Sequence, residues 1–274
     1  MEKYGLKLYE QQENVINTDI LKDDEITFSV LKRIVNANSA KVFTDGKRIV
    51  ICHSHPLFPV WIWTVEDITQ EEIKRVAQCL CEEFPLSGGF RYNISYELMD
   101  KLKFIDERLR EYEIETNLLS FKCDRINDIQ KKCDGRYRLA VQDDMEVLWK
   151  YMYNFGLEAE GREFPEEHCR RSIQEKLDVK ALYVWENEEG QIVATTSKRF
   201  DDAYTGISLV YTVPDARRKG YALNLVHTLT KEILDDGKTA ILYTDADYVA
   251  SNSCYKKIGY KEVGSMCTVK ERIR

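Results

Sequence analysis

The sequence predicts a mixed α/β protein made of two domains, each built around its own sheet. The chain has 274 residues, of which 43% are hydrophobic, and this is enough to bury two cores of ordinary size. From residue 136 to 268, short strand-type and longer helix-type hydrophobic patterns alternate. The segment "WTVED" at 63–67 also resembles "YTVPD" at 211–215, with comparable spacings after both. These observations indicate an α/β fold, of the α+β mixed-sheet kind, present in two tandem copies.

The C-terminal half begins with a strand and two helices. Residues 136–142 have a strand pattern, and a helix is expected at 145–155. The segment 156–165 has a loop composition, and Pro165 then begins a second helix. Two helices are therefore expected before the main strands.

The rest of this half alternates strands and helices. A run that is apolar on both faces predicts a buried strand, and a glycine after a helical pattern predicts where that helix ends. The expected order of the half is βααβββαβαβ. Its remaining elements are a hairpin at 181–200, a buried strand at 206–213, a helix at 220–235, a strand at 239–244, a short helix at 250–258 and a last strand at 259–270.

The N-terminal half repeats part of this order. A hairpin is expected around the Asp45-Gly46 turn, followed by a strand, a helix, a strand, a helix and a strand. The polar stretch at 129–136 marks the boundary, so the predicted domains are 1–132 and 133–274. The alternative is that two α/β domains share an element order by chance.

Composition excludes several classes of protein. The formal net charge of −7 leaves no basic surplus for nucleic acid, and it slightly favours a cationic partner. Apolar runs such as "PVWIW" are too short to cross a membrane, and no targeting segment is visible, so a cytoplasmic location is expected. No G-x-x-x-x-G-K-[ST] sequence is present, which disfavours a nucleotide hydrolase.

The cysteines and histidines do not predict a metal site. The eight cysteines are scattered and form no C-x-x-C pair, so reduced thiols are expected. Cys52, His53 and His55 lie close in sequence, but a strand sends Cys52 and His53 to opposite faces and no second cluster completes a ligand set. We therefore expect no metal.

Three consecutive cations precede the glycine that opens the helix at 220–235. A helix N-terminus leaves its first N–H groups without partners, and with the helix dipole they can bind an anion such as a diphosphate. Gly220 would let the backbone approach a phosphate oxygen, and Arg217, Arg218 and Lys219 would supply positive charge. A solvated basic turn is the alternative explanation of this pattern alone.

Two motifs in this half resemble those of the GNAT superfamily of N-acetyltransferases. Arg217, Gly220 and Ala222 occupy the places of the acetyl-CoA-binding motif, in which Arg or Gln is followed by Gly and then Gly or Ala after a strand with a bulge. Tyr255 begins a block "YKKIGY" similar to the family's Tyr-x-Lys-x-Gly-aromatic block. The matches run in order from about residue 136 to 268, and the glycine N-acyltransferase-like branch is the nearest in appearance. The resemblance implies the GNAT fold and acetyl-CoA as cosubstrate.

The resemblance also implies roles for individual residues. Tyr255 would be the general acid that protonates the departing thiolate, although a core aromatic on a short helix has the same pattern. A strand N–H group would stabilise the oxyanion. The predicted cofactor-binding residues are Tyr211, Thr212 and Val213 for the pantetheine arm, and Arg217, Arg218, Lys219, Gly220, Tyr221 and Ala222 for the diphosphate.

Two departures from the family pattern affect this assignment. The family usually has Asn where this chain has Tyr248, so Ser251 or Asn252 is expected to take over that CoA contact. The strand at 206–213 contains no carboxylate to act as the base that many relatives have there. A water molecule could carry the proton away, or the reaction needs no base. Otherwise the base is one of four nearby acids, each of which is also explained as an ordinary surface residue: Glu158, Glu160, Asp201 and Asp202.

The N-terminal copy lacks the features of an anion site. After "WIWTVED" it has no glycine, and Glu71 and Glu72 stand where phosphates would need cations, so we expect no CoA binding there. Trp61 and Trp63 are its most prominent aromatics, with core packing as their default role. The predicted function is acetyl transfer from acetyl-CoA to a small-molecule or peptide amine by a monomer or homodimer. The alternative is a non-catalytic acyl-CoA-binding regulatory module.

Overall fold

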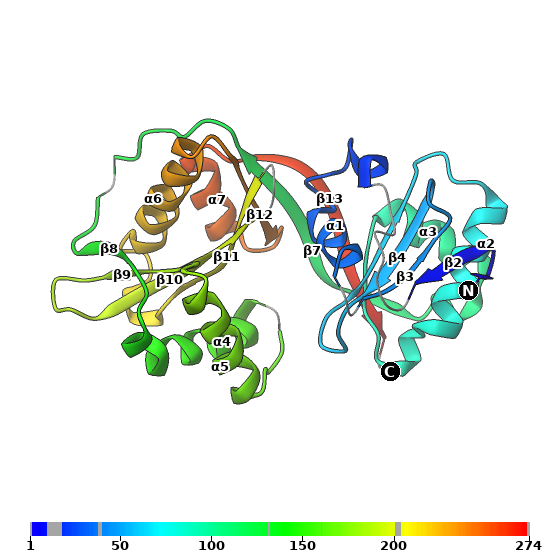
Figure 1. The fold of residues 1–274 in the computed structure, drawn as a ribbon, viewed down its shortest axis with the longest axis horizontal. Helices are drawn as coiled ribbons and strands as arrows, with labels where there is room; N and C mark the ends of the chain where they lie inside the picture. The colour runs from blue at the N-terminus through cyan, green and yellow to red at the C-terminus, as the bar shows by residue number, and fades with distance from the viewer. Residues whose placement is uncertain are drawn as a thin grey trace. The chain divides into compact units, whose positions relative to one another are not determined.

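The computed structural model describes residues 2–9, 18–37, 40–130, 132–159, 161–200 and 204–272. The chain forms two compact units (Figure 1). Unit 1 comprises Met1–Ser120, Asp245–Asp247 and Val263–Arg274, and unit 2 comprises Phe121–Thr244 and Tyr248–Glu262. Within the described ranges, no helix combines the length and apolar character that a membrane crossing needs.

Unit 1 is a sheet covered by helices. Its hydrophobic core joins strand residues such as Ile51 and Ile62 to helix residues such as Val76, Leu80 and Leu102. Its elements are β1 (Glu2–Lys3), β2 (Leu6–Tyr9), η1 (Thr18–Leu21), α1 (Ser29–Val35), β3 (Lys41–Thr44), β4 (Ile49–His53), β5 (Val60–Thr64), α2 (Gln70–Glu83), η2 (Leu86–Gly88), β6 (Tyr92–Ile94), α3 (Tyr96–Ile105), η3 (Glu107–Leu109), most of β7 (Tyr112–Cys123) and most of β13 (Lys261–Glu271). The strand order is β1-β2-β3-β4-β5-β6-β13-β7.

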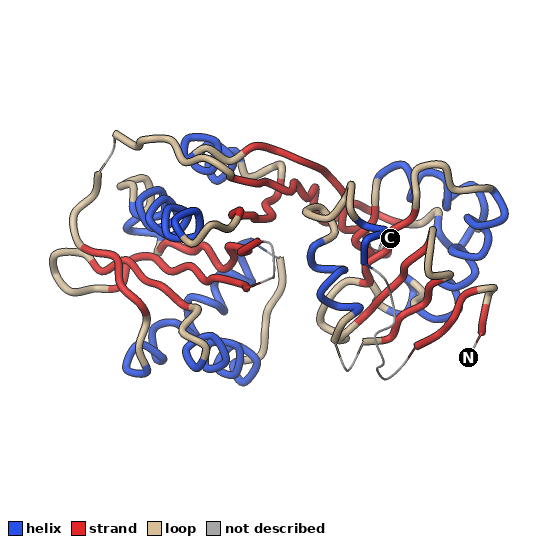
Figure 2. The backbone as a smooth tube through the Cα atoms, turned by 45° about the horizontal axis from the view of Figure 1, so that its top comes forward, coloured by secondary structure: helices blue, strands red, loops and turns tan. Residues whose placement is uncertain are grey.

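The strands of unit 2 follow the order β7-β12-β11-β10-β9-β8, with the end of β7 contributed at one edge. The helices α4 and α5 lie on one side of its strands, and α6 and α7 lie on the other (Figures 1 and 2). Its elements are β8 (Arg136–Leu139), η4 (Gln142–Asp144), α4 (Met145–Ala159), α5 (Glu166–Asp178), β9 (Leu182–Glu186), β10 (Ile192–Phe200), β11 (Tyr204–Thr212), η5 (Pro214–Ala216), α6 (Tyr221–Asp235), β12 (Thr239–Asp245) and α7 (Val249–Ile258). The expected element order is confirmed, but α4 continues to Ala159 through part of the predicted loop.

The two units repeat one arrangement. In both, a parallel pair follows two antiparallel hairpin strands: β5 with β6, and β11 with β12. The first strand of each pair ends at the threonine of "WTVED" or "YTVPD". The next residue donates its N–H to the neighbouring chain segment: Val65 to the O of Arg48, just before β4, at 3.0 Å, and Val213 to the O of Val193 in β10 at 3.1 Å. The tandem repeat predicted from the sequence is therefore a repeat of structure.

The last strand lies in the other unit from the one predicted. Residues 267–269 of β13 pair with β6 in the register Cys267↔Ile94 to Val269↔Tyr92. Residues 121–132, in turn, belong to unit 2. The predicted domains therefore differ from the two units at residues 121–132 and at the last strand. An apolar strand pattern shows that a strand is buried, but not which neighbouring strand it joins.

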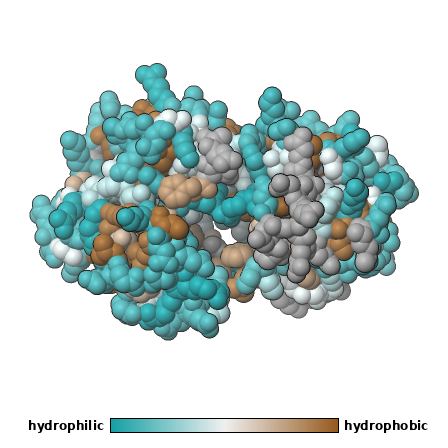
Figure 3. Space-filling model, in the orientation of Figure 1, coloured by the Kyte–Doolittle hydropathy of each residue, from teal (hydrophilic) through white to brown (hydrophobic). Residues whose placement is uncertain are grey.

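On the face that Figure 3 shows, most of the described surface is hydrophilic, and hydrophobic side chains form a few patches. This agrees with a chain in which 32% of the residues are charged. Buried apolar side chains are accordingly concentrated in the sheet and helix interfaces described above.

Candidate active site

The strands β11 and β12 diverge in the middle of unit 2. Their parallel register runs from Tyr204↔Thr239 to Ile207↔Leu242. Beyond that point β11 continues to Thr212 while still pairing with Ala194 of β10 on its other side. In this described part of the sheet, one edge of the end of β11 therefore has no strand neighbour and can hydrogen-bond an extended ligand.

A β-bulge lies where the divergence begins. Leu209 has a positive φ of 52°, which is uncommon for a residue with a side chain, and the register with β10 shifts beside it. The Ser208 carbonyl accepts hydrogen bonds from Thr196 Oγ1 at 3.2 Å and Ser197 Oγ at 3.3 Å. Since bulges bend a strand and raise its twist, this one directs the end of β11 away from β12. Sequence reasoning missed the hydroxyls of "TTS", whose only signal is three polar residues in a buried strand.

The loop after β11 presents backbone N–H groups at the start of α6. Arg218 and Gly220 both have a positive φ, 64° and 105°. Backbone N–H groups that follow one another in such a conformation point into a concavity that can bind an anion. Asn224 donates its backbone N–H and its Nδ2 to the Gly220 carbonyl, each at 3.0 Å. No side chain of the described residues caps this helix. The first N–H groups of α6 are therefore available to an anion.

The equivalent helix of unit 1 has a closed N-terminus. Thr69 and Glu72 form a capping box at the start of α2. Glu72 also pairs with Arg48 at 2.7 Å, and this hydrogen bond is the main reason why its pKa falls to about 2. Of the two acids that replace the cations of unit 2, Glu72 is thus bound into the helix start, whereas Glu71 is exposed. The contrast between α2 and α6 supports the expectation that only unit 2 has an anion site.

Arg217 is bound to its own unit. Its Nε donates to the Thr212 carbonyl at 3.0 Å, and its guanidinium lies 5.7 Å from the centre of the Tyr211 ring. A terminal nitrogen lies 2.5 Å from a carboxylate oxygen of Glu158. Arg217 therefore joins the loop to β11 and to α4, which the sequence did not predict. The neighbouring Arg218 and Lys219 are exposed.

The predicted strand residues differ in what they offer a ligand. Val213 uses its N–H for Val193 of β10, which corrects the expectation that this group is free. The Thr212 carbonyl is taken by Arg217, but its hydroxyl oxygen is buried with no hydrogen-bond partner among the described residues. Tyr211 is buried against Tyr151 of α4, with ring centroids 5.3 Å apart.

Tyr221 anchors the first turn of α6. Its hydroxyl donates to Asp134 Oδ1 at 2.5 Å, and this hydrogen bond, with some burial, raises the pKa of Tyr221 to about 12. The Trp185 indole donates to the Asp134 carbonyl at 2.7 Å. The side chain of Tyr221 is thus structural. Of the groups of Tyr221, only the backbone N–H is left for the predicted contact with the diphosphate. Ala222, one position on, is half-buried.

Tyr255 lies on the inner face of α7. It is 7% exposed and meets the Tyr260 ring edge-on, with centroids 6.0 Å apart. Burial raises its pKa well above the ordinary value of a tyrosine, so the phenol keeps its proton at neutral pH. Asn252 is buried one turn earlier on the same helix, and Ser251 beside it is half-buried.

Glu158 contacts the residues that follow both diverging strands. Besides the Arg217 pair, its backbone carbonyl accepts a hydrogen bond from the hydroxyl of Tyr248, the residue before α7. Tyr248 stands where the family usually has Asn, and here it ties α7 to the end of α4. Of the four acids considered as bases, the structure describes Glu158 alone. The other three, Glu160, Asp201 and Asp202, lie outside the described residues.

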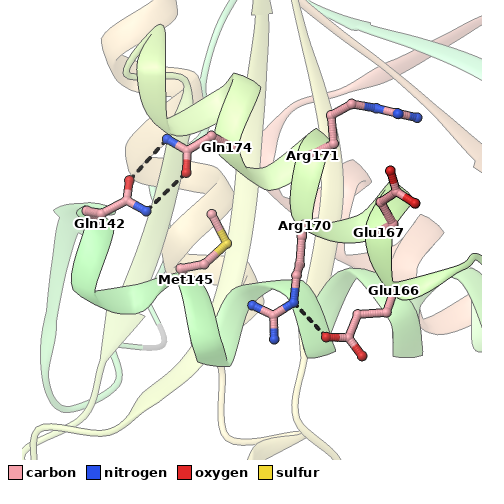
Figure 4. Close-up of a pocket in the computed structure, with 7 residues that line it drawn as sticks. All are labelled: Gln142, Met145, Glu166, Glu167, Arg170, Arg171 and Gln174. Carbon is pink, nitrogen blue, oxygen red and sulfur yellow. Dashed lines mark hydrogen bonds and ion pairs between the residues drawn. The ribbon is translucent and has the colours of Figure 1, made fainter.

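A hollow of unit 2 lies elsewhere, along α5 (Figure 4). It has a volume of about 600 Å³ and contains none of the predicted site residues. Its polar groups bond to each other: Arg170 to Glu166 at 2.6 Å, and the amides of Gln142 and Gln174 at 3.0 Å. We therefore place the candidate site at the diverging strands. In the described ranges, no three His, Cys, Asp or Glu side chains gather into a possible metal site.

Comparison with known proteins identifies the fold. Residues 187–269 match the family model described as FR47-like protein. An acetyltransferase of the GNAT family from Colwellia psychrerythraea has 14% identity and a TM-score of 0.56, with 97% of this chain and 99% of that chain covered. The chain has the GNAT fold, and its residues 187–269 are similar to the FR47-like family.

Two further solved structures show the GNAT fold over most of the chain. A GCN5-related N-acetyltransferase from Sphaerobacter thermophilus is 14% identical, with a TM-score of 0.67 and coverage of 90% of this chain and 85% of that one. A Drosophila protein is 14% identical, with a TM-score of 0.62 and coverage of 92% and 87%. No curated protein matches the sequence. Because these matches extend over both units, the tandem GNAT architecture is confirmed.

Proposed function

We propose that unit 2 binds acetyl-CoA and that the protein transfers the acetyl group to a primary amine. One observation carries this proposal: the pairing of β11 with β12 ends at Ile207, beside an α6 N-terminus that no described side chain caps. A free strand edge suits an extended amide-containing chain, and an uncapped helix start suits a diphosphate. CoA joins these two chemical groups in one molecule.

The residues around this opening fit the two groups. The backbone N–H groups from Arg218 to Ala222 would bind the diphosphate, with positive charge from Arg218 and Lys219. The edge of β11 that has no strand partner after Ile207 would bind the pantetheine arm. Arg217 already occupies the Thr212 carbonyl at its end, but the buried Thr212 hydroxyl is a polar atom that a ligand could satisfy. Ser251 and Asn252 would contribute from α7.

Acetyl-CoA supplies a thioester whose carbonyl carbon is attacked by the amine nitrogen, with the C–S bond breaking and the thiolate leaving. Tyr255 would donate a hydrogen bond and then a proton to that sulfur. A thiol has a pKa of about 8.5, well below that of the buried phenol. Because proton transfer is then uphill, we expect hydrogen bonding to the thiolate to be the larger part of its contribution.

The amine must lose a proton during the reaction. Glu158 is one candidate to accept it, with one of its carboxylate oxygens bound to Arg217. Water, Glu160, Asp201 and Asp202 are the other candidates. We assign unit 1 no cofactor, because its corresponding helix is closed by Thr69 and Glu72.

Calorimetry with acetyl-CoA tests this function, with Gly220→Glu as the variant. The new carboxylate would repel the diphosphate and fill the space it needs, so we expect binding heat in the wild type and none in the variant. The positive φ of Gly220 adds a stability cost of about 1–2 kcal/mol.

Gly190→Glu is the matched control, because Gly190 also has a positive φ, 76°, but lies in the turn between β9 and β10. It should bind acetyl-CoA like the wild type. Affinity retained in Gly220→Glu would refute the diphosphate site.

The second candidate function is a regulatory module that binds acyl-CoA without transferring the acyl group. The observation that favours it is the engagement of Glu158 with Arg217, since it occupies the described candidate base. Release of free CoA with a panel of polyamines, amino sugars, amino acids and peptides separates the two. Binding without release would favour the module.

A further inference from the structure

The last turn of α4 is tied across the opening between β11 and β12. The Glu158 carboxylate pairs with Arg217, in the loop after β11, and the Glu158 carbonyl accepts from Tyr248, after β12. The backbone returns onto this turn, since the Arg162 N–H donates to Gly156 O at 3.1 Å. Gly156 lies against the Phe164 ring, where a Cβ would approach within 2.5 Å. The position of Glu158 is therefore fixed by several independent contacts.

Two contacts besides Glu158 hold Arg217 in place. Its Nε is held by the Thr212 carbonyl at 3.0 Å, and its guanidinium lies over Tyr211. The Glu158 and Arg217 side chains are 43% and 42% exposed, and ion pairs at this exposure contribute little to stability. The position of Arg217 therefore does not depend on Glu158 alone. The Glu158 carboxylate instead neutralises the charge of the Arg217 guanidinium.

The negative end of the α4 helix dipole is unfavourable for the carboxylate of Glu158. The last turn of α4 contains no basic residue, so the carboxylate stands at the negative end of the helix dipole with Arg217 as its counter-charge. A diphosphate at the start of α6 would bring further negative charge to the same guanidinium. The carboxylate and the diphosphate would then compete for Arg217 and repel each other.

We propose that Glu158 is an affinity-determining residue: its carboxylate competes with the diphosphate of the acyl carrier for Arg217 and so lowers the affinity for CoA. This inference rests on the proposed function, because it requires the diphosphate to lie at the start of α6. Binding of CoA releases the Glu158 carboxylate at the end of α4. The contact therefore lowers the affinity for the substrate and for the CoA product alike, which favours product release.

The test is calorimetry with CoA on the full chain, comparing the wild type with Glu158→Gln. Removing the competing charge should tighten CoA binding by more than about twofold and up to about fivefold, the upper value corresponding to the ~1 kcal/mol of one exposed charge interaction. The difference should shrink at high salt, since exposed charges are screened. Unchanged or weaker binding of CoA by Glu158→Gln overturns the proposal, and weaker binding would make Glu158 a brace for Arg217.

Glu163→Gln is the matched control for net charge. Glu163 lies in the same connection, is exposed, and accepts from the Tyr153 hydroxyl at 2.7 Å rather than from Arg217. The affinity of the Glu163→Gln variant for CoA should stay within about twofold of that of the wild type. An equal gain in both variants would mean a general charge effect and would overturn the assignment to Glu158.

A double-mutant cycle with Arg217→Gln tests the competition itself. Glutamine can still donate to the Thr212 carbonyl, but it carries no charge for Glu158 or a diphosphate. Adding Glu158→Gln to this variant should then give less than half of the gain seen in the wild type, in units of free energy. An equal gain in both backgrounds would contradict competition for Arg217. If the wild type itself fails to bind CoA, the proposed function fails; if the wild type binds and Glu158→Gln gives no gain, this inference alone fails.

Discussion

Single side chains in unit 2 have roles that follow from their contacts more than from their type. Arg217, Arg218 and Lys219 are adjacent cations, yet Arg217 has three partners in the fold while Arg218 and Lys219 are exposed. Tyr221 and Tyr255 are both buried tyrosines, but Tyr221 donates to Asp134. Tyr255 is in contact with Tyr260 and is the one to which we assign chemistry.

At the residue scale, Tyr255→Phe should lower the rate of CoA release about 100-fold, the lower end of the range for general acids. The phenyl ring keeps the contact with Tyr260, so the thermal midpoint should change little. Because burial raises the pKa of Tyr255, the wild-type phenol stays protonated, and its titration should cause no loss of rate up to about pH 10.

The matched variant is Tyr153→Phe, a tyrosine of α4 whose hydroxyl donates to Glu163. It should leave the rate unchanged. If Tyr255→Phe behaves in the same way at every pH tested, the assignment of Tyr255 is wrong.

At the scale of elements, one helix and one strand distinguish the two copies. The helices α2 and α6 follow equivalent strands, but α2 starts with a capping box and α6 with a glycine at positive φ. The bulge at Leu209 turns the end of β11 away from its parallel neighbour. Together these differences explain why one copy is proposed to bind a cofactor and the other is not.

We expect Glu72→Gln to destabilise unit 1 at pH 7. The pKa of Glu72 is lowered from 4.5 to about 2, chiefly by the hydrogen bond with Arg48 and then by the backbone of Thr69. A lowered pKa in the folded state adds stability above the unfolded pKa, and this stability is lost as the pH falls through the folded value. The difference between the wild type and the variant should therefore be constant at neutral pH and decrease from about pH 4.5 to pH 2.

Urea unfolding followed by tryptophan fluorescence measures this difference, since Trp61 and Trp63 lie in unit 1. Glu71→Gln is the control, because Glu71 is exposed and its nearest cation, Lys74, is 3.9 Å away. A pH-independent difference for Glu72→Gln would show that its charge is not the stabilising feature.

At the scale of the whole molecule, the chain returns to its first unit at its last strand. Met266, Cys267 and Val269 of β13 are at most 1% exposed, and Thr268 donates to Asn93 of β6 at 2.7 Å. Ser120 of β7 bonds to the Gly264 carbonyl at 3.0 Å. Unit 1 is therefore not complete at residue 132, where the sequence pattern placed its end.

Ending the chain after Glu262 should destabilise unit 1. The truncation removes a buried strand and leaves the backbone groups of β6 without their partners. Hydrogen exchange should become faster in the peptides that cover β5 and β6. Unchanged protection of these peptides would show that unit 1 folds without β13.

Local patterns in the sequence determine most of the elements and the place of the site. Hydrophobic periodicity predicts the strands and helices, because each must bury one face or both. The residues "ARRKGYA" predict an anion site, with a solvated basic turn as the alternative, because a glycine at a helix start lets the backbone approach a phosphate among the three cations. The repeat of "WTVED" and "YTVPD" marks equivalent strand ends, which the structure confirms at Thr64 and Thr212.

Contacts between residues far apart in sequence were decided only by the tertiary structure. No local pattern relates Glu158 to Arg217 and Tyr248, because these residues meet through the packing of α4 beside the diverging strands. The partner of β13 depends on which sheet edge is open, and alternating apolar residues suit either edge. The sequence by itself determined what each segment can form, and long-range packing decided which segments meet, since burial is favourable against any complementary apolar surface.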